Sequence, residues 1–468
     1  MKLRDIISDS GAVILEGTPG QEILGISNDS RDIREGWAFL AVKGFARDGH
    51  DFIPAARAAG AAAILSCDRH ALAVCAANFY GNPSRRLKLV GITGTNGKTT
   101  TVTLLYHLFT RLGHKCGLLS TIANYVGEER FEAVNTTSDP LTINALMTRM
   151  LEKGCTHCFM EVSSIGLEQE RVAGLDFDVA IFSNLTHDHL DYHKTFAEYL
   201  RCKKLFFDGL DKKAVAITNV DDKNGRIMVQ NTRARIVTYS CRGVADHKCR
   251  VLEEGFEGML LNIDGRECWT RLIGLHNAYN ILAIYSAAVA LGAEQEEALV
   301  AISALQSAPG RLEAINGPRG ICAVIDYAHT PDALENVLKT LREIAPKRQL
   351  VCLFGCGGDR DRSKRPEMAA VAQKGADRLI ITSDNSRTEK TADIIAEIKT
   401  GLDADGRRKA ICIEDREEAI RAALMTAQDN ATILLAGKGH EDYQIIGTEK
   451  RHFDEHEIVR KVFAEMGE

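Results

Sequence analysis

The chain has 468 residues, with 58 Lys and Arg against 64 Asp and Glu, so its formal net charge is −6. That balance excludes a generally basic nucleic-acid-binding protein. Hydrophobic residues make up 45% and charged residues 26%, which is ordinary for globular proteins and excludes disorder as the main state. At about 150 residues per domain, this length predicts about three domains.

No apolar run approaches the roughly 18 residues that a membrane-spanning helix needs. The longest candidate, residues 55–67, carries Arg57 and favours a helix that runs into a strand. Near the N-terminus, Asp5 and Asp9 lie where a signal peptide would need apolar residues. We therefore expect a cytoplasmic protein with neither a membrane nor a nucleic acid as partner. A monomer is a separate expectation that these features do not determine.

The 13 cysteines are scattered and odd in number, which favours free thiols in a reducing compartment. Several lie in apolar, strand-like runs where burial is expected: Cys322, Cys352 and Cys412. Cys155 and Cys158 form a C-x-x-C pair, but no second pair stands at zinc spacing. We interpret this pair as flanking the entry to a buried strand.

Two kinds of segment alternate along most of the chain. Short apolar, β-branched runs predict buried parallel strands at 88–93, 179–183, 214–218, 321–326, 350–354, 378–382 and 432–436. Segments with a 3.6-residue period predict helices at 99–112, 142–153, 278–291 and 332–344. Such alternation is typical of doubly wound α/β domains.

Loop-forming residues at 80–86 and at 307–311 indicate two domain boundaries. The expected domains are residues 1–86, 87–308 and 309–468. Between residues 236 and 271 the pattern changes to short alternating strands, which predicts an antiparallel edge on the middle domain.

A glycine-rich loop, Gly94-Thr95-Asn96-Gly97-Lys98-Thr99-Thr100, connects the strand at 88–93 to a helix. Glycines let backbone N–H groups close around phosphate oxygens, and the helix N-terminus favours an anion. Lys98 can neutralise the charge of β- and γ-phosphates, while the Thr99 hydroxyl can ligate Mg²⁺. The usual spacing places a glycine five positions before Gly97, but Ile92 stands there, so the loop is a shortened variant.

Polar residues farther along the middle segment are candidates for metal and nucleotide contacts. Glu161 ends an apolar strand, and a carboxylate there suits Mg²⁺. A zinc site is disfavoured, because the histidines near His189 lack the spacing of a zinc helix and no cysteine lies near them in sequence. From the residues alone, Lys203 fits a solvated helix face. Asn277 and Asn280 alone would pass for helix-capping residues.

The shortened loop and these blocks resemble the Mur ligase family, ATP-dependent amide-forming enzymes that also include the folylpolyglutamate synthetases. The resemblance implies a small N-terminal α/β domain, a central P-loop-type ATPase domain with a mostly parallel sheet, and a Rossmann-like C-terminal domain. It implies that Glu161 and His189 hold Mg²⁺ and that Lys203 is an N6-carboxylysine whose carbamate ligates a second Mg²⁺. It also implies that Asn277 and Asn280 lie by the adenine.

Further blocks match the family members that add a diamino acid to a UDP-MurNAc dipeptide, nearly from end to end. The resemblance implies that the N-terminal domain grips the uridine nucleotide through Ser30, with Asn28 and residues 45–47 as neighbours. Contacts to the muramoyl dipeptide are implied for Asn135, Thr136, Thr137, Ser163, Gln169 and Arg171.

The incoming amino acid is implied by a block near residue 384. Members that add diaminopimelate carry Asp-Asn-Pro-Arg there, and lysine-adding members lack the Arg. This chain has Asp384-Asn385-Ser386-Arg387, which keeps the Arg and replaces the Pro. A guanidinium can bind the extra carboxylate of diaminopimelate bidentately. Arg360, Gly437 and Glu441 match the remaining contacts to this substrate.

The implied reaction adds diaminopimelate to UDP-MurNAc-L-Ala-D-Glu through an acyl phosphate, in cytoplasmic peptidoglycan precursor synthesis. Because Ser386 stands where diaminopimelate-adding members have Pro, L-lysine or another diamino acid remains an alternative as the incoming amino acid. The diaminopimelate isomer is undetermined. A folylpolyglutamate-synthetase-like ligase would lack the N-terminal domain and the block at 384. A regulatory P-loop ATPase would leave Gln169, Arg171 and the Arg360/Arg387 pair unexplained. Without a G-x-G-x-x-G motif at Gly357-Gly358, no dinucleotide cofactor is expected.

Overall fold

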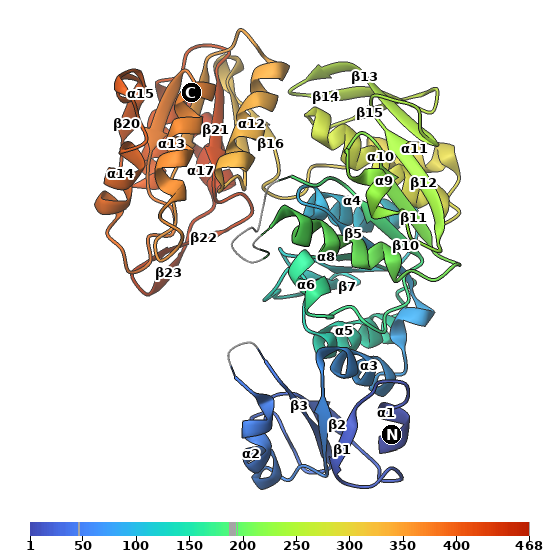
Figure 1. The fold of residues 1–468 in the computed structure, drawn as a ribbon. Coiled ribbons are helices and arrows are strands. Elements are labelled where there is room, and N and C mark those ends of the chain that lie inside the picture. Colours follow the sequence, from blue (N-terminus) through green and yellow to red (C-terminus); the bar gives the residue numbers. More distant parts are fainter. Residues whose placement is uncertain (45–46, 187–192, 194, 468) are drawn as a thin grey trace. The chain divides into compact units, whose positions relative to one another are not determined.

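The computed structural model describes residues 1–44, 47–186, 193 and 195–467 (Figure 1). It divides into two compact units. The first unit contains residues 1–250, 263–266 and 279–302, and the second contains residues 251–262, 267–278 and 303–468. Within the described residues, the strands form three larger sheets and one hairpin.

The N-terminal segment forms a four-stranded sheet in the order β1-β4-β3-β2, coloured blue in Figure 1. Its elements are α1 (Leu3–Ile6), β1 (Val13–Glu16), β2 (Gly25–Ser27), β3 (Trp37–Val42), α2 (Ile53–Ala58), β4 (Ala63–Cys67) and α3 (Arg69–Phe79). Short 3₁₀ turns lie at Gly49–Phe52 and Pro83–Arg86. The predicted helix running into a strand at 55–67 is confirmed by α2 and β4.

The second sheet has 11 strands in the order β15-β14-β13-β12-β11-β10-β5-β9-β6-β7-β8. Its strands are β5 (Lys88–Thr93), β6 (Cys116–Leu119), β7 (Asn124–Val126), β8 (Glu129–Phe131), β9 (His157–Glu161), β10 (Val179–Phe182), β11 (Val215–Asn219), β12 (Arg235–Ser240), β13 (His247–Gly255), β14 (Gly258–Ile263) and β15 (Arg266–Thr270). The strands from β12 to β6 are all parallel, as their apolar runs predict.

The helices that follow these strands are α4 (Lys98–Arg111), α5 (Pro140–Glu152), α6 (Ser164–Glu168), α8 (Phe196–Asp208), α9 (Gly225–Met228), α10 (Leu275–Ala290) and α11 (Gln295–Ser303). Helix α5 begins where Asp139 accepts a hydrogen bond from the Thr142 amide and Pro140 fills the first turn. Thr195 caps α8 in the same way by accepting from the Glu198 amide. These caps fix the start of α8, which carries Lys203, and the start of α5, which follows the expected substrate contacts at 135–137.

Two expectations for the middle and C-terminal segments need correction. The antiparallel edge expected over 236–271 begins one strand late, because β12 pairs parallel with both β11 and β13. Strands β13, β14 and β15 do lie in sequential order at the edge of the sheet, and their two-residue connections can join only antiparallel strands. A short alternating run reports one solvated face but not the direction of its partner strand. Cys412 is exposed on β20 (Ala410–Cys412) because that strand lies at the edge of its sheet.

The C-terminal segment forms a six-stranded sheet in the order β16-β17-β21-β18-β19-β20, which is parallel apart from β16. Its remaining strands are β16 (Glu313–Asn316), β17 (Cys322–Asp326), β18 (Leu350–Phe354), β19 (Arg378–Ile381) and β21 (Thr432–Ala436). Its helices are α12 (Pro331–Ile344), α13 (Lys364–Gly375), α14 (Thr391–Lys399), α15 (Ala404–Lys409), α16 (Arg416–Met425) and α17 (Glu455–Gly467), and a hairpin joins β22 (Tyr443–Ile446) to β23 (Glu449–His452).

Both faces of this sheet are buried. On β17, Cys322 and Val324 contribute to one hydrophobic core, while Ala323 and Ile325 contribute to another. Alternate residues of a strand point to opposite faces, so two cores on one strand require covering layers on both sides. The predicted α/β class, with mostly parallel sheets, is confirmed.

A buried ion pair joins α16 to α17 in the C-terminal segment. Arg416 Nε lies 2.8 Å from Glu455 Oε1, and both side chains are fully buried. The guanidinium also donates to the carbonyls of Ser383 and Ala436. We expect Glu455→Gln to lower the free energy of unfolding by about 3–5 kcal/mol, because it leaves a buried guanidinium charge without its counterion. Urea unfolding of the full chain measures this loss.

The matched control for this variant is the ion pair between Arg421 and Glu465. It joins the same two helices, but its side chains are partly exposed. Glu465→Gln should leave the free energy of unfolding nearly unchanged, because water screens an exposed pair. Equal losses in the two variants would show that burial does not govern the Arg416 interaction.

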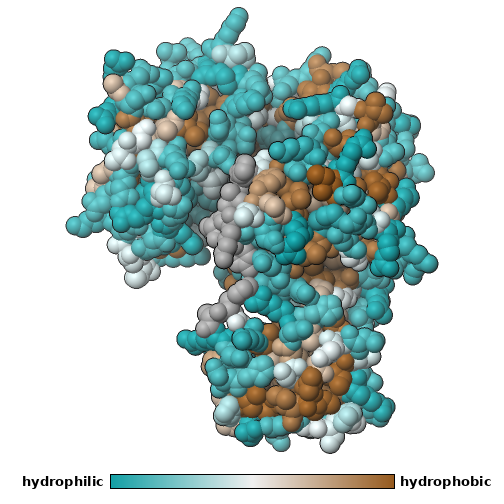
Figure 2. Space-filling model, in the orientation of Figure 1, coloured by the Kyte–Doolittle hydropathy of each residue, from teal (hydrophilic) through white to brown (hydrophobic). Residues whose placement is uncertain are grey.

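The face of the molecule drawn in Figure 2 is mostly polar, with apolar residues in separate groups. Within the described part of the chain, no helix combines the length and the apolar character needed to cross a membrane.

Candidate functional site

The glycine-rich loop lies at the carboxyl end of β5 and leads directly into α4. Both loop glycines stand where a side chain would collide. A Cβ on Gly94 would lie 1.9 Å from Ser183 Oγ, and one on Gly97, which has a φ of +86°, would lie 2.5 Å from Asn280 Oδ1. The chain therefore uses glycine here for both backbone geometry and space.

Residues that follow β10 hold this loop in place. The Thr95 amide donates to the Asn184 carbonyl at 2.8 Å, and the Asn96 amide donates to Asn184 Oδ1 at 3.0 Å. Ser183 Oγ donates to the Asn96 carbonyl at 2.7 Å. Adjacent parallel strands thus fix the loop at a common carboxyl edge, where open α/β sheets bind ligands.

Two lysine amines converge on one backbone carbonyl of the loop. Lys98 Nζ donates to the Gly94 carbonyl at 2.9 Å and to the Thr95 carbonyl at 2.8 Å. Lys203, which is 1% exposed, donates to the same Gly94 carbonyl at 2.8 Å. Its amine also lies 4.6 Å from the centre of the Tyr199 ring. The expectation of a solvated helix face at Lys203, drawn from the residues alone, was wrong.

Glu161 lies on the strand next to the loop. It is 1% exposed and pairs with Ile92, two residues before Gly94. Its Oε1 accepts from the Thr121 amide at 2.9 Å. Among the residues that the structure describes, Glu161 Oε2 has no hydrogen-bond donor. A buried carboxylate oxygen in this state is suited to ligating a cation.

The remaining residues expected around the nucleotide and the metal lie on α4 and α10 or outside the described part of the chain. Thr99 and Thr100 are buried in the first turn of α4. Asn280 Oδ1 accepts from Thr101 Oγ1 at 3.4 Å, which puts Asn280 beside the loop. Asn277 is buried and donates to the Ile273 carbonyl at 2.8 Å. His189 lies outside the described residues.

Residues expected to contact the muramoyl dipeptide form one connected group. Thr137 Oγ1 donates to the Glu161 carbonyl and lies 3.1 Å from Ser163 Oγ. Arg171 donates to the Thr137 carbonyl at 2.6 Å and to Gln169 Oε1 at 2.7 Å. The structure therefore connects this group directly to Glu161.

Three further residues expected to contact the nucleotide substrate lie nearer the surface. Thr136 accepts from Thr121 Oγ1 at 3.1 Å, while Asn135 is exposed. Ser30 is half-buried in the turn after β2. Beside it, Arg31 holds the pKa of Asp29 down to about 2 through their side-chain hydrogen bonds. Asn28 is exposed, and Phe45 and Ala46 lie outside the described residues.

The block at 384 is largely buried where the chain leaves β19. Asn385 Nδ2 donates to Glu441 Oε2 at 2.9 Å, and Asn385 Oδ1 accepts from the Ile445 amide at 2.8 Å. The fully buried Lys438 amine lies 3.0 Å from Glu441 Oε2 and 3.9 Å from Asp384 Oδ1. The buried cation thus balances two carboxylates at this position.

Arg387 has an uncommon backbone conformation, with φ at +48°. It is fixed because its amide donates to the Ile445 carbonyl and its carbonyl accepts from the Gly447 amide. Its guanidinium donates to the Gly358 carbonyl at 2.9 Å. A left-handed conformation at a non-glycine residue costs about 1–3 kcal/mol and often marks a functional position.

The loop that carries Arg360 lies against the same block. A Cβ on Gly357 would lie 3.1 Å from Arg387 Nη1 and 3.6 Å from Arg360 Cγ, so this glycine lies close to both arginines. Ser386 is 2% exposed. The Gly437 amide donates to the Asp326 carbonyl at 3.0 Å, at the carboxyl end of β21.

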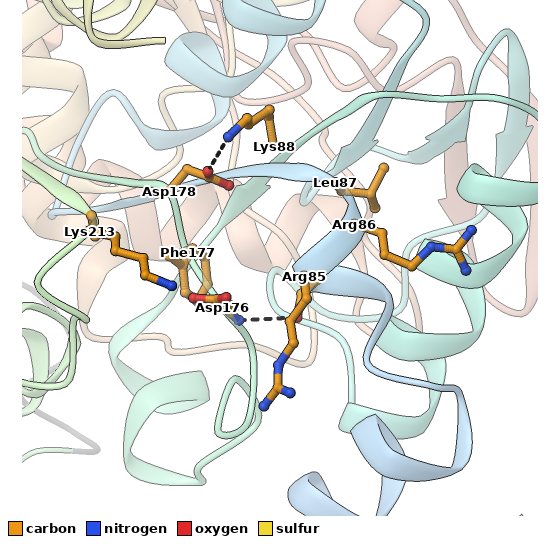
Figure 3. Close-up of a pocket in the computed structure, with 10 residues that line it drawn as sticks. Arg85, Arg86, Leu87, Lys88, Asp176, Phe177, Asp178 and Lys213 are labelled. Atoms are coloured by element: carbon orange, nitrogen blue, oxygen red, sulfur yellow. Dashed lines mark hydrogen bonds and ion pairs between the residues drawn. The ribbon is translucent and has the colours of Figure 1, made fainter.

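One cavity of about 150 Å³ lies apart from these residues (Figure 3). It is lined by residues that precede or begin strands β5, β10 and β11, among them Lys88, Asp178 and Lys213. Lys88 and Asp178 form an ion pair there at 2.9 Å. Because the glycine-rich loop follows the carboxyl end of β5, this cavity belongs to the opposite edge of the sheet.

Sequence reasoning missed residues that support the expected site. Lys438 stands between the expected contacts Gly437 and Glu441, so its place in the motif was a usable signal. Arg365 is fully buried and pairs with Glu389 and Glu397, and this pairing holds the pKa of Glu389 down to about 2. No local pattern distinguished Arg365 from the arginines around it.

Comparisons with known proteins match nearly the whole chain. Three family models match: "Mur ligase family, catalytic domain" over residues 22–89, "Mur ligase middle domain" over residues 92–289, and "Mur ligase, glutamate ligase domain" over residues 310–439. A UDP-N-acetylmuramoyl-L-alanyl-D-glutamate–2,6-diaminopimelate ligase of Phocaeicola vulgatus is 48% identical over 99% of this chain and 100% of its own length.

Solved structures of Mur ligases also match the chain over most of its length. A UDP-N-acetylmuramoyl-L-alanyl-D-glutamate–2,6-diaminopimelate ligase matches with a TM-score of 0.73 and 32% identity, over 100% of this chain and 99% of the other. A MurF ligase from Thermotoga maritima in complex with ADP matches with a TM-score of 0.62 and 18% identity, over 94% of this chain and 96% of the other.

Proposed function

The chain belongs to the Mur ligase family, and from that membership we propose that it joins 2,6-diaminopimelate to UDP-MurNAc-L-Ala-D-Glu at the expense of ATP. The observation that carries this proposal is the Arg387 block, with Asn385, Glu441 and Lys438 packed around it, in a chain 48% identical over full length to a diaminopimelate-adding relative. The product is a UDP-MurNAc tripeptide, a precursor of peptidoglycan.

ATP is proposed to bind at the glycine-rich loop, with its phosphates facing the N-terminus of α4. Backbone N–H groups of residues 94–100 surround the phosphates, and Lys98 neutralises their charge. In the structure the Lys98 amine is already held 2.8–2.9 Å from two loop carbonyls. Asn277 and Asn280 are proposed to line the adenine side of the site.

The residues beside the loop fit Mg²⁺. The fit rests on the buried Glu161 Oε2, which has no donor among the described residues, and on hard oxygen donors, which Mg²⁺ prefers. We propose that Thr99, Glu161, His189 and the carbamate of Lys203 hold Mg²⁺. The metal supplies charge neutralisation for the phosphoryl group. Lys203 is proposed to reach it from α8, because its amine already touches the loop.

The first chemical step is phosphoryl transfer to the γ-carboxylate of the D-Glu residue. The carboxylate oxygen attacks the γ-phosphorus, ADP leaves, and an acyl phosphate forms. The chain's contribution is to position the carboxylate and to balance charge. Thr137, Ser163, Gln169 and Arg171 are proposed to hold the dipeptide portion, since they form one group joined to Glu161. Ser30, Asn135 and Thr136 are proposed to contact its nucleotide and sugar portions.

In the second step the diaminopimelate amine attacks the activated carbonyl, and phosphate leaves the tetrahedral intermediate. Arg387 and Arg360 are proposed to bind the far carboxylate, and Glu441 the far amino group. Asp384, Asn385, Ser386 and Gly437 are proposed to complete the site. The buried Lys438 acts as a positioning residue, because it holds Glu441 at 3.0 Å.

We propose domain boundaries between residues 86 and 87 and between residues 308 and 309. We also propose a monomer that works in the cytoplasm, where its free cysteines remain reduced. A folylpolyglutamate-synthetase-like activity is the weaker candidate, because the N-terminal segment matches a Mur ligase model over residues 22–89.

The test of the proposed function is a panel of amino acids assayed with ATP and UDP-MurNAc-L-Ala-D-Glu, with product masses as the readout. ADP should form only when the nucleotide dipeptide and diaminopimelate are both present, and the product mass should be that of the tripeptide. ATP turnover that needs neither substrate would contradict a ligase. Equal use of L-lysine would contradict the amino-acid assignment.

We expect Arg387→Ala to reduce selectivity for diaminopimelate over L-lysine by roughly 30-fold to several thousand-fold. The guanidinium meets a carboxylate that lysine lacks, and removing one partner of such a pair costs about 2–5 kcal/mol, at about 1.4 kcal/mol per decade. The measurement is kcat/KM for meso-diaminopimelate, LL-diaminopimelate and L-lysine in both proteins.

The control for this variant is Arg362→Ala, which removes an exposed arginine that pairs with Glu397. It should leave the ratio of kcat/KM values near that of the unaltered chain. Ser386 replaces the family's Pro. If this makes the loop more mobile, the loss of selectivity in Arg387→Ala would lie nearer 30-fold than several thousand-fold. An unchanged ratio in Arg387→Ala would rule out the arginine clamp.

A further inference from the structure

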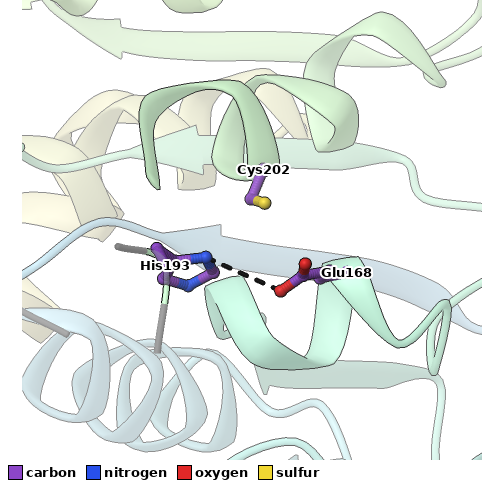
Figure 4. Close-up of side chains that lie close together, drawn as sticks. All are labelled: Glu168, His193 and Cys202. Carbon is purple, nitrogen blue, oxygen red and sulfur yellow. Dashed lines mark ion pairs between the residues drawn. The ribbon is translucent and has the colours of Figure 1, made fainter. Parts of the chain in front are cut away.

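Three side chains of types that bind metals, none of them a predicted magnesium ligand, meet inside the first unit. Their donor atoms, on Glu168, His193 and Cys202, lie within 4.8 Å of one another (Figure 4). Glu168 ends α6, Cys202 lies in α8, and His193 precedes α8. Glu168 lies 25 or more sequence positions from each of its two partners, so the packing of these elements brings the three residues together.

We propose that Glu168, His193 and Cys202 form a binding site for a thiophilic divalent cation, with Zn²⁺ as the ion that fits best. The proposal goes beyond the ligase function and does not rest on it. Thiolate, imidazole and carboxylate are the donors that zinc takes in proteins, whereas Mg²⁺ avoids sulfur. Three protein donors leave a fourth tetrahedral position for water.

The geometry is close to what zinc requires. His193 Nδ1 lies 3.6 Å from Glu168 Oε2. With bonds of about 2.0–2.3 Å, the donors of a tetrahedral zinc site lie about 3.3–3.6 Å apart. The donor separations of up to 4.8 Å therefore call for a small contraction. Figure 4 shows the imidazole and the carboxylate facing each other, with the Cys202 thiol above the ion pair between them.

Ser164 orients the imidazole for this role. Its buried hydroxyl lies 2.9 Å from His193 Nε2. When Nε2 carries the proton and donates to the hydroxyl, Nδ1 presents its lone pair toward Glu168. A partner on the second ring nitrogen is typical of metal-ligating histidines.

Burial and charge also favour a cation at this position. Cys202 is fully buried, and the His193 side chain is as well. A cation would stabilise the thiolate and the carboxylate together, and the thiol would release its proton to water as the metal binds. Because Lys203 follows Cys202, the bound ion would fix α8 next to a predicted site residue.

The test uses Co²⁺ and Zn²⁺ as probes on the full, chelator-treated chain, in excess Mg²⁺ that fills oxygen-only sites. One Co²⁺ per chain should bind with thiolate-to-cobalt charge-transfer absorption, and Zn²⁺ should displace it. Cys202→Ser should abolish that absorption, whereas Cys241→Ser, a cysteine elsewhere in the first unit, should retain it. No substrate or turnover is needed, so the result is independent of the ligase assignment.

Two milder variants test the other donors and keep the proposal falsifiable if Cys202→Ser fails to fold. Glu168→Gln removes a charged ligand and should weaken Co²⁺ affinity by at least 10-fold, while Ser164→Ala should weaken it by roughly 10–100-fold through the loss of ring orientation. The proposal is overturned if the unaltered chain shows no charge-transfer absorption, if Cys202→Ser retains it, or if both milder variants bind Co²⁺ as tightly as the unaltered chain.

Discussion

Lys98→Ala should lower kcat/KM for ligation by about 10³-fold or more, while the fold remains intact. Removing a single hydrogen-bond donor from a transition-state charge costs about 10²–10³-fold, and Lys98 contributes a full positive charge. Its amine is held 2.9 Å from the Gly94 carbonyl and 2.8 Å from the Thr95 carbonyl, at the place where the phosphates are proposed to bind. The measurement is ADP release with all three substrates present, together with circular dichroism of the variant.

The matched control is Lys88→Ala. Lys88 begins β5, the strand that leads into the loop, but its amine pairs with Asp178 at the opposite edge of the sheet. Its removal should leave turnover close to that of the unaltered chain. If Lys98→Ala turned over at the unaltered rate, the assignment of residues 94–100 to ATP phosphates would be wrong.

Lys203→Ala should also lose nearly all ligation, and short carboxylic acids such as formate or acetate should restore part of it. The proposed carbamate forms when Nζ attacks CO₂ and the nitrogen releases a proton, so a cation becomes an oxygen ligand. Lys203 is 1% exposed and its amine lies 2.8 Å from the Gly94 carbonyl. An added carboxylic acid can enter the space of the missing side chain and supply the lost oxygens. The measurement is activity against acid concentration.

Lys204→Ala is the control, because Lys204 is next in sequence but pairs with Asp208 on its own helix. It should keep activity and show no response to added acid. A second readout uses ¹³C-labelled bicarbonate, whose carbamate signal should appear in the unaltered chain and vanish in Lys203→Ala. A high-resolution map of an active crystal with a plain Lys203 amine would refute the carbamate.

Local sequence determined much of the fold. The runs at 88–93, 350–354 and 432–436 match β5, β18 and β21 in full, because a parallel strand buried on both faces must be apolar along its length. The order of strand, glycine loop and helix at Gly94 could also be predicted from the sequence. It depends on backbone geometry within a few residues and not on distant partners.

Strand pairing was decided by the tertiary structure. The alternating pattern over 236–271 predicted an antiparallel edge, but the first of its strands, β12, pairs parallel with β11. Alternation reports that one face of a strand is solvated, whereas the direction of the neighbour depends on how the chain crosses between them.

The environment of single side chains was likewise decided by tertiary contacts. Lys203 and Lys204 are indistinguishable as neighbours in sequence, yet one is buried against the Gly94 carbonyl and the other pairs with Asp208. Zinc was disfavoured because the histidines lack the spacing of a zinc helix and no cysteine lies near them in sequence, but the packing of α8 brings the Cys202 thiol to His193. Periodicity assigns a residue to a helix, while burial and partners depend on the surfaces that pack against that helix.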